Sequence, residues 1–277
     1  SPQLDFSAVS PQAPACILFT TGSTGKKKGV VLSQENMVSI CEGAAFAIDA
    51  KKHKKEISPL PNFHLMKIAT IVSLYGMGME HYINRNSKRT LKDIEEQKPS
   101  AIQIVPLTME AMEQSAAKAR EYRKKLEEDP SKGTLHEKLR QFDENLKTIS
   151  VGGAFSNPET ITFFEDLGID VLTAYGMTEA GVISSQREGR KKQGSVGEVA
   201  PGVELRIVDG EILVRGRNVM LGYYKDPEGT KAVLGDGWVH TGDLGYVDEE
   251  GFLFLTGRKK NLIILANGEN VSPEELE

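Results

Sequence analysis

The sequence predicts an α/β fold in which a largely parallel sheet is flanked by helices and followed by a small antiparallel β subdomain. Up to about residue 193, short apolar runs alternate with segments of helical periodicity, which is the pattern of βαβ units. After Gly194 the pattern changes to closely spaced strand-like runs separated by turn residues. A chain of 277 residues is long enough to bury a large core and to hold more than one lobe.

The first elements can be taken in order from the beginning of the chain. Residues 1–14 contain three prolines and few periodic apolar positions, so they are expected to be a lead-in or a linker. Ala15–Thr20 is expected to form a buried strand, and Gly29–Leu32 a short strand after a glycine-rich loop. Ser33 is the expected N-cap of a helix over Gln34–Ile48, where apolar residues recur at helical spacing.

The rest of the predicted parallel part follows the same logic. Thr90 and Asp93 have the spacing of a capping-box variant, which predicts a short polar helix ending near Lys98. Asn157 and Pro158 predict the cap and the first turn of another helix. The other elements expected here are a charged loop at His53–Glu56, an apolar buried helix after Pro59–His64, strands at Ala101–Val105, Thr148–Val151 and Asp170–Ala174, and two or three amphipathic helices with a solvated charged face within Thr108–Leu146.

The second half contains a strong hairpin signal. Val203–Val208 alternates apolar and polar residues, and Glu211–Val214 continues as an apolar run after an Asp209-Gly210 turn. Further short strands are expected at Trp238–His240, Leu244–Val247 and Phe252–Thr256. We therefore expect residues 1–193 to belong to a large α/β domain and residues 194–257 to form its β subdomain.

Composition excludes some function classes. The net charge of −5 argues against general nucleic-acid binding, because no basic excess is present to neutralise phosphates. The two cysteines, Cys16 and Cys41, are too few for a disulfide scaffold and are expected to be buried free thiols, which fits a cytoplasmic setting. No secretory signal is recognisable, and the apolar run Ile68–Met79 is too short to be a transmembrane segment.

The most informative segment is Phe19–Val30, with the sequence FTTGSTGKKKGV. Its glycines let the backbone approach a ligand, while its hydroxyls and lysines suit a polyphosphate. The spacing of Gly22 and Gly25 differs from G-x-x-x-x-G-K-[ST], which argues against a P-loop kinase or ATPase. A flexible surface loop remains the alternative for this segment taken alone.

Four further segments change this interpretation. They are AYGMTE at Ala174–Glu179, TGD at Thr241–Asp243, GRKKN at Gly257–Asn261 and GENVSPEELE at Gly268–Glu277. Together with the glycine-rich segment, and in this order, they resemble the adenylate-forming enzymes, a superfamily of acyl-CoA synthetases, aryl-CoA ligases, luciferases and peptide-synthetase adenylation domains. The resemblance extends from Ile17 to the last residue and implies the adenylate-forming enzyme fold.

The resemblance implies a site for ATP and Mg²⁺. Lys28 matches the loop lysine that accompanies the β- and γ-phosphates, although Lys27 stands where the family usually has proline. Tyr175 would stack on adenine, Thr178 would bind a phosphate oxygen, and Glu179 would hold Mg²⁺, with Thr20 as a second candidate near the metal. The full set expected to contact ATP is Thr20, Thr21, Gly22, Ser23, Thr24, Gly25, Lys28, Gly153, Ala154, Tyr175, Gly176, Met177, Thr178, Asp243, Arg258 and Lys260.

Other roles follow from the same resemblance. Asp243 would accept hydrogen bonds from the ribose hydroxyls, and Arg258 would reach the ribose or the α-phosphate. Lys260 matches the hinge about which the small C-terminal domain turns between half-reactions, so residues 258–277 are expected to be the hinge and the start of that domain. His64 matches a histidine near the substrate carboxylate, with a helix cap as the alternative. The catalytic set implied is Lys28, His64, Thr178 and Glu179.

The activity implied is ATP-dependent formation of an acyl-adenylate from a fatty acid, followed by transfer of the acyl group to CoA. Val219–Gly268 is most similar to long-chain acyl-CoA synthetases. Loading of a carrier protein and an inactive nucleotide-binding module remain alternatives. Because the family's N-terminal region and C-terminal catalytic lysine are not in this sequence, we expect the chain to bind ATP or an acyl-adenylate but to adenylate poorly.

Overall fold

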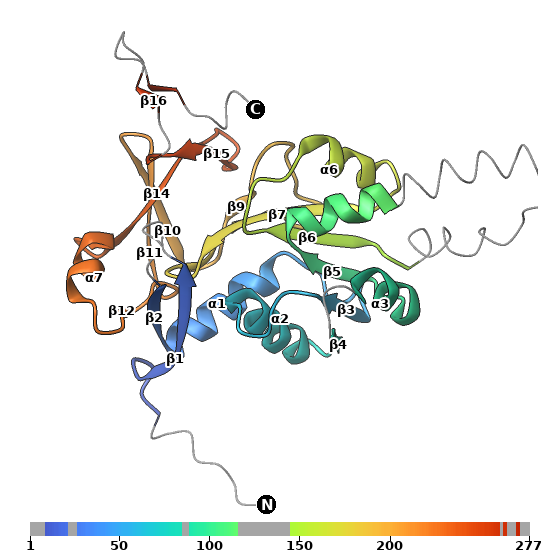
Figure 1. The fold of residues 1–277 in the computed structure, drawn as a ribbon, viewed down its shortest axis with the longest axis horizontal. Helices are drawn as coiled ribbons and strands as arrows, with labels where there is room; N and C mark the ends of the chain where they lie inside the picture. The colour runs from blue at the N-terminus through green and yellow to red at the C-terminus, as the bar shows by residue number, and fades with distance from the viewer. Residues whose placement is uncertain are drawn as a thin grey trace, which may run out of the picture. The chain divides into compact units, whose positions relative to one another are not determined.

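The computed structural model describes residues 9–20, 27–84, 89–115 and 145–260, together with the backbone of 21, 263–264 and 270–271 (Figure 1). These residues fall into two compact units, which we describe separately. The parallel-sheet unit consists of Ala47–Ala174 and Gln186–Lys191. The strand-rich unit consists of Ser1–Phe46, Tyr175–Ser185 and Lys192–Glu277.

The parallel-sheet unit is built on five parallel strands in the order β4-β3-β5-β6-β7. The strands are β3 (Lys55–Ser58), β4 (Glu80–Ile83), β5 (Ala101–Ile104), β6 (Thr148–Gly152) and β7 (Asp170–Met177). The last three residues of β7 belong to the strand-rich unit. Its helices are α2 (Leu65–Gly76), α3 (Thr90–Gln97), residues 106–115 and α6 (Pro158–Glu165), and Figure 1 shows them flanking the strands. Apolar strand residues such as Ile102, Ile149 and Val171 pack with Phe164 of α6 into one buried cluster.

The strand-rich unit begins with an antiparallel sheet in the order β1-β2-β12. These strands are β1 (Pro14–Thr21), β2 (Lys27–Ser33) and β12 (Gly222–Tyr223). Helix α1 (Gln34–Phe46) follows and packs on β8 (Gly181–Ser185). The helix comes so close that a Cβ added at Gly181 would lie 2.3 Å from Ile40, which explains why glycine occupies this position.

A second antiparallel sheet of the strand-rich unit has the order β10-β11-β14-β13, and β15 also pairs with β14. Asp209 and Gly210 both have positive φ, as a type I′ turn requires, so the predicted hairpin of β10 and β11 is confirmed. The bounds of the remaining elements are β9 (Glu198–Val199), β10 (Val203–Val208), β11 (Glu211–Gly216), α7 (Pro227–Val233), β13 (Leu234–Gly235), β14 (Trp238–Val247), β15 (Leu253–Arg258), β16 (Ile263–Ile264) and β17 (Asn270–Val271).

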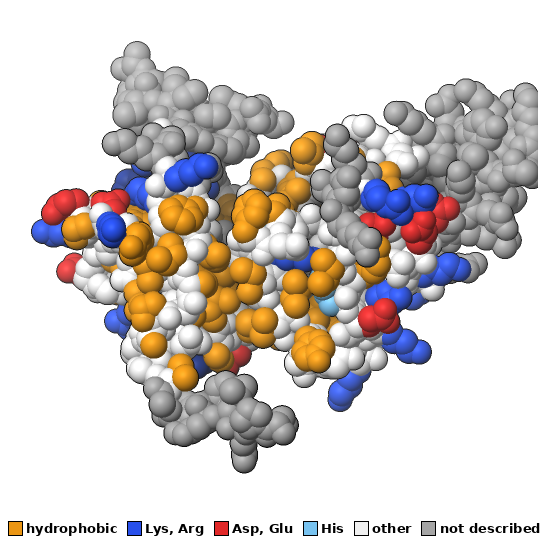
Figure 2. Space-filling view, turned by 60° about the horizontal axis from the view of Figure 1, so that its bottom comes forward, with side chains coloured by type: hydrophobic (Ala, Val, Ile, Leu, Met, Phe, Trp, Pro, Cys, Tyr) orange, Lys and Arg blue, Asp and Glu red, His pale blue; other side chains and the backbone are white. Residues whose placement is uncertain are grey.

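Several predicted details are wrong in the first sheet of the strand-rich unit. The predicted strand Ala15–Thr20 exists within β1 but is not buried, because Phe19 is 68% exposed and Ile17 is 39% exposed. Large hydrophobic side chains also reach the surface elsewhere (Figure 2). Cys16 and Cys41 are free cysteines, as predicted, but are half-buried rather than buried. The first two strands pair antiparallel instead of joining a parallel sheet.

Two predictions for charged segments are also wrong. The expected loop at His53–Glu56 ends inside strand β3, and both His53 and Glu56 are buried. The N-cap of α3 is Arg89 rather than Thr90, and the Asp93 carboxylate accepts hydrogen bonds from Asn84 and Arg89. Sequence pattern marked these residues as exposed or capping because it does not show the partners that the fold brings to them.

Other predicted elements are confirmed with shifted bounds. The helix expected over Gln34–Ile48 ends at Phe46, and the strands expected at Trp238–His240 and Leu244–Val247 form the single strand β14. Asn157 caps α6 by accepting a hydrogen bond from the Glu159 N–H, as expected. Most of Thr108–Leu146 lies outside the described residues.

No helix in the described ranges is long and apolar enough to cross a bilayer.

Candidate functional site

The glycine-rich segment connects two paired strands. Thr20 and Thr21 at the end of β1 lie opposite Lys28 and Lys27 at the start of β2. The predicted site residues Gly22, Ser23, Thr24 and Gly25 lie outside the described residues. Antiparallel pairing continues up to Thr21 and Lys27, so the backbones on both sides of the glycine-rich segment meet at one end of the sheet.

Thr20 has an unusual hydroxyl. Its Oγ1 is buried and has no hydrogen-bond partner among the described residues. A buried hydroxyl without a partner costs free energy, so such a group in a native protein calls for an explanation. A hydroxyl oxygen here fits a phosphate oxygen or a hard cation such as Mg²⁺ as its partner.

Glu179 is held in the turn that follows β7. Its side chain is buried, and its Oε1 accepts a hydrogen bond of 2.7 Å from the hydroxyl of Tyr223. Its backbone carbonyl accepts a hydrogen bond from the Met220 N–H at 2.9 Å. Tyr223 in turn lies beneath Lys28, whose Nζ is 4.4 Å from the centre of the ring. The structure therefore joins the predicted residues Glu179 and Lys28 through a tyrosine that sequence analysis missed.

The other residues of the AYGMTE segment have different surroundings. Gly176 has no room for a side chain, because an added Cβ would lie 2.1 Å from the Gly181 carbonyl oxygen. Met177 is half-buried and packs against a core cluster of the same unit. Thr178 is half-buried in the turn before Glu179.

Tyr175, Asp243 and Arg258 form a second group of predicted residues in the same unit. The hydroxyl of Tyr175 donates a hydrogen bond of 2.7 Å to Asp243 Oδ2, and Arg258 Nε lies 2.9 Å from Asp243 Oδ1. Asp243 and Arg258 are direct partners in the β14–β15 register. Burial raises the pKa of Asp243, while Tyr175 and Arg258 oppose that rise. Burial and the neighbouring carboxylate raise the pKa of Tyr175, so its hydroxyl remains a donor.

A neighbouring ion pair holds the backbone around Asp243. Glu211 accepts a hydrogen bond from the Gly242 N–H at 3.1 Å and pairs with Lys259 at 2.9 Å. Burial works to raise the pKa of Glu211, but Lys259 and the Gly242 N–H lower it overall. Glu211 is a second residue that sequence analysis missed, because its role depends on pairing between β11 and β14. Lys260 follows as an exposed residue.

Three predicted residues belong to the parallel-sheet unit. His64 is the N-cap of α2, with its Nδ1 accepting a hydrogen bond of 3.2 Å from the Met66 N–H. Desolvation lowers the pKa of His64, which favours the neutral imidazole that this cap requires. Gly153 has a φ of 89° and, with Ala154, is exposed just after β6.

The donors available for a metal are oxygen atoms. No group of three or more His, Cys, Asp or Glu residues that could hold a metal ion is found in the part of the chain that the structure describes. Glu179 and Thr20 are the predicted ligands, and a single carboxylate with a hydroxyl suits Mg²⁺, which usually retains water and binds substrate phosphates. This donor set fits a metal that arrives with a nucleotide.

The fold is α/β, and these groups are of the kinds that bind nucleotides in proteins. The chain belongs to the AMP-binding enzyme family, whose sequence profile matches residues 2–224. This agrees with the family that the ordered motifs suggested.

Individual relatives are CoA ligases of several kinds. The chain is 32% identical to the long-chain-fatty-acid–CoA ligase FadD15 of Mycobacterium bovis over 95% of this chain and 50% of the relative. It is 32% identical to the indoleacetate–CoA ligase of Aromatoleum aromaticum over 97% of this chain and 52% of the relative. The chain thus spans about half the length of the curated relatives it matches.

The fold matches that of an enzyme solved with nucleotide and metal. The O-succinylbenzoate coenzyme A synthetase of Bacillus subtilis, in complex with ATP and a magnesium ion, superposes with a TM-score of 0.76 at 27% identity. The match covers 97% of this chain and 55% of that structure. The adenylate-forming fold predicted from the motifs is confirmed.

Proposed function

We propose that this chain is the ATP-binding part of an AMP-forming acid–thiol ligase. Such an enzyme joins a carboxylate to the α-phosphorus of ATP, releases pyrophosphate, and passes the acyl group to the thiol of CoA. The observation that carries the proposal is the buried Asp243 carboxylate, held between the Tyr175 hydroxyl and the Arg258 guanidinium. This arrangement offers a fixed, charged acceptor to a pair of ribose hydroxyls.

The other groups have roles that adenylation requires. In-line attack at phosphorus needs positioning and neutralisation of spreading charge more than covalent help from the protein. Glu179 and Thr20 would hold Mg²⁺, which supplies charge neutralisation at the phosphates. Lys28 would bind the β- and γ-phosphates with the glycine-rich loop, Thr178 would bind a phosphate oxygen, and Arg258 would reach the ribose or the α-phosphate.

The remaining predicted contacts complete the proposal. Tyr175 and Gly176 would border the adenine, together with Met177, Gly153 and Ala154. His64 would lie near the substrate carboxylate in addition to capping α2. Residues 258–277, with Lys260 as the hinge, would begin the C-terminal domain of a longer enzyme, after the α/β domain of residues 1–193 and its β subdomain of residues 194–257.

The acid is proposed to be a fatty acid, with an aryl acid as the alternative. Long-chain-fatty-acid–CoA ligases support the first choice, while the indoleacetate and succinylbenzoate ligases support the second. Transfer to a carrier protein instead of CoA is a further alternative, and so is a chain that binds nucleotide without turning it over. Exchange of labelled pyrophosphate into ATP, measured with fatty, aryl and amino acids in turn, distinguishes these acids.

Binding tests the proposal independently of turnover. Calorimetric titration of the 277-residue chain with ATP and MgCl₂ is expected to show binding, and Glu179→Gln is expected to weaken it about tenfold or more through loss of the metal ligand's charge. Glu249→Gln, an exposed residue of the β14–β15 turn, is the matched control and should bind as the parent does. A parent that binds neither ATP nor AMP would overturn the proposed function.

A further inference from the structure

Tyr223 occupies a position that faces Lys28. It lies on β12, where it pairs with Val30 of β2. Side chains two residues apart on a strand share a face, so Lys28 and Val30 point to the same side of the sheet, and Tyr223 is the diagonal neighbour of Lys28 across the strands. Lys28 Nζ accordingly lies 4.4 Å from the centre of the Tyr223 ring, within the range of a cation–π interaction.

The hydroxyl of the same side chain is used differently. It donates a hydrogen bond of 2.7 Å to Glu179 Oε1, and both residues are only 8% exposed. A hydroxyl bonded to a buried carboxylate forms a strong, charge-assisted hydrogen bond. Burial and the carboxylate raise the pKa of Tyr223, so the hydroxyl keeps its proton at neutral pH.

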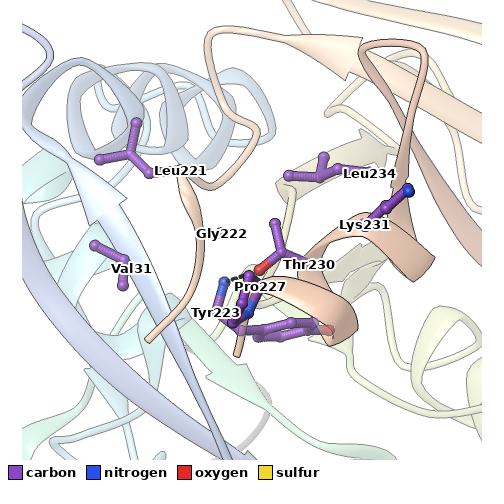
Figure 3. A pocket seen from close by; sticks show the side chains of 8 residues that line it. All are labelled: Val31, Leu221, Gly222, Tyr223, Pro227, Thr230, Lys231 and Leu234. Atoms are coloured by element: carbon purple, nitrogen blue, oxygen red, sulfur yellow. Dashed lines mark hydrogen bonds between the residues drawn. The ribbon is translucent and has the colours of Figure 1, made fainter. Parts of the chain in front are cut away.

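The backbone of Tyr223 is anchored by α7. Its N–H donates a hydrogen bond of 2.8 Å to Thr230 Oγ1, and that hydroxyl donates to the Asp226 carbonyl at 2.8 Å. Figure 3 shows Thr230 beside Tyr223, with this bond drawn as a dashed line, along a groove lined also by Val31 and Leu234. At Gly222 an added Cβ would lie 2.9 Å from Thr230 Cγ2, so the approach of α7 to β12 depends on glycine.

We propose that Tyr223 is a positioning residue for Mg·ATP, whose hydroxyl fixes the carboxylate of Glu179 and whose ring fixes the ammonium group of Lys28. The inference rests on the proposed function, since it assigns Glu179 to the metal and Lys28 to the phosphates. In this role Tyr223 acts through Glu179 and Lys28 rather than by binding the nucleotide itself. It couples the two groups that do, because one rigid ring with an anchored backbone contacts both.

The two contacts can be separated by substitution. Tyr223→Phe keeps the ring and removes the hydroxyl, while Tyr223→Leu removes both. The neighbouring Tyr224→Phe is the matched control, because Tyr224 is 49% exposed and its ring contacts Lys225 instead. Each 277-residue variant is titrated calorimetrically with ATP in the absence and presence of MgCl₂, and with AMP.

Tyr223→Phe is expected to reduce the Mg²⁺-dependent gain in ATP affinity about tenfold and to leave AMP affinity unchanged. Tyr223→Leu is expected to weaken metal-free ATP binding as well, about threefold, because Lys28 loses its cation–π contact with the ring. In the double variant Tyr223→Phe/Glu179→Gln, the loss of Mg²⁺-dependent ATP affinity should be no larger than in Glu179→Gln alone. A merely structural role would instead weaken AMP, ATP and Mg·ATP together.

The outcomes separate this inference from the proposed function. If the parent binds Mg·ATP and Tyr223→Phe retains the same Mg²⁺ dependence, the positioning role is overturned and the proposed function stands. A Tyr224→Phe effect as large as that of Tyr223→Phe would also overturn it. If the parent binds neither ATP nor AMP, the proposed function fails and the positioning role fails with it.

Discussion

Each unit of this protein contains a buried carboxylate, and the two are neutralised in different ways. In the parallel-sheet unit, Glu56 belongs to what we call the Lys67 cluster, which consists of Glu56, Lys67 and His81. In the strand-rich unit, Asp243 belongs to the Asp243 cluster, which consists of Tyr175, Asp243 and Arg258. From the difference between these clusters we expect the Glu56 carboxylate to stabilise the fold, whereas the Asp243 carboxylate is the one proposed to bind a ligand.

The Lys67 cluster is compensated by buried charges. Lys67 on α2 is 1% exposed, donates a hydrogen bond to the Ser58 carbonyl, and lies 2.9 Å from His81 Nε2. The other nitrogen of His81 contacts Glu56, which is fully buried on β3. The three side chains thus form a row from α2 to the sheet, with the Lys67 ammonium group at one end and the Glu56 carboxylate at the other. These two opposite charges neutralise each other.

The Asp243 cluster is compensated by a neutral hydroxyl and by a cation at the surface. Arg258 has a side chain that is 64% exposed, so its charge is screened by water and can turn toward a ligand. Tyr175 provides only a hydrogen bond to the carboxylate. The free-energy cost of removing this carboxylate from water is therefore only partly offset when no ligand is bound, which is typical of a binding group.

The largest expected effect is on the Lys67 cluster. Glu56→Gln removes the only negative charge of the cluster and leaves Lys67 buried without a counter-charge, which should lower the free energy of unfolding by about 3–5 kcal/mol. The matched control is Glu80→Gln on the adjacent strand β4, where the carboxylate is 66% exposed and the pair with Lys55 should contribute about 1 kcal/mol or less. Urea denaturation measures both, and equal effects would show that the cluster is no more structural than a surface ion pair.

The opposite result is expected for the matching substitution in the other cluster. Asp243→Asn keeps the shape and the hydrogen bond from Tyr175 but removes the charge, so AMP affinity should fall about tenfold. Stability at neutral pH should not fall, because the change removes a desolvated charge and an ion pair whose Arg258 partner is exposed and screened by water. Calorimetry and denaturation of the same variant measure the two effects.

The pH dependence of Asp243→Asn provides an independent check. Because the pKa of Asp243 is raised in the folded state, that state binds more protons than the unfolded chain between the unfolded pKa, near 3.8, and the folded one. The stability of the parent should therefore decline as pH rises through this window, and the variant should lack that decline. A stability difference between parent and variant that is constant with pH would contradict the assignment of Asp243 as a desolvated binding group.

The contrast also explains what could be predicted from the sequence. The members of the Asp243 cluster were identified singly, because each stands in a local motif, but their contacts with one another were not predicted. The Asp209-Gly210 hairpin was predicted because two positive-φ residues suffice for a type I′ turn. The Lys67 cluster was missed because His53–Glu56 has the composition of a solvated loop. Only pairing of β3 with β4 and packing of α2 bring His81 and Lys67 to Glu56.

The same limit applies to the candidate site. Glu179 and Lys28 were assigned from motifs, whereas Tyr223 and Glu211 depend on strand pairs that join residues far apart in the chain. Thr90 was taken as a cap from its spacing to Asp93, but Asn84 and Arg89 provide Asp93 with other partners. Local motifs therefore supplied the candidate site residues, whereas the partners that long-range strand pairing gives them could not be predicted.

The smallest expected effect is a slope in stability at alkaline pH. Burial lowers the pKa of Lys67, with Glu56 opposing, so between the folded pKa and the unfolded value of 10.5 the unfolded chain binds more protons. Stability contributed by this group should rise with pH in that window, and Lys67→Met should lack the rise. Lys51→Met, at an exposed position of the same unit, should keep the slope of the parent. The other lysines and tyrosines titrate in both variants, so their contribution cancels when the two slopes are compared. If Lys67→Met also kept that slope, Lys67 would be solvated in solution, and its cluster would then resemble the Asp243 cluster, in which the compensating cation stays in contact with water.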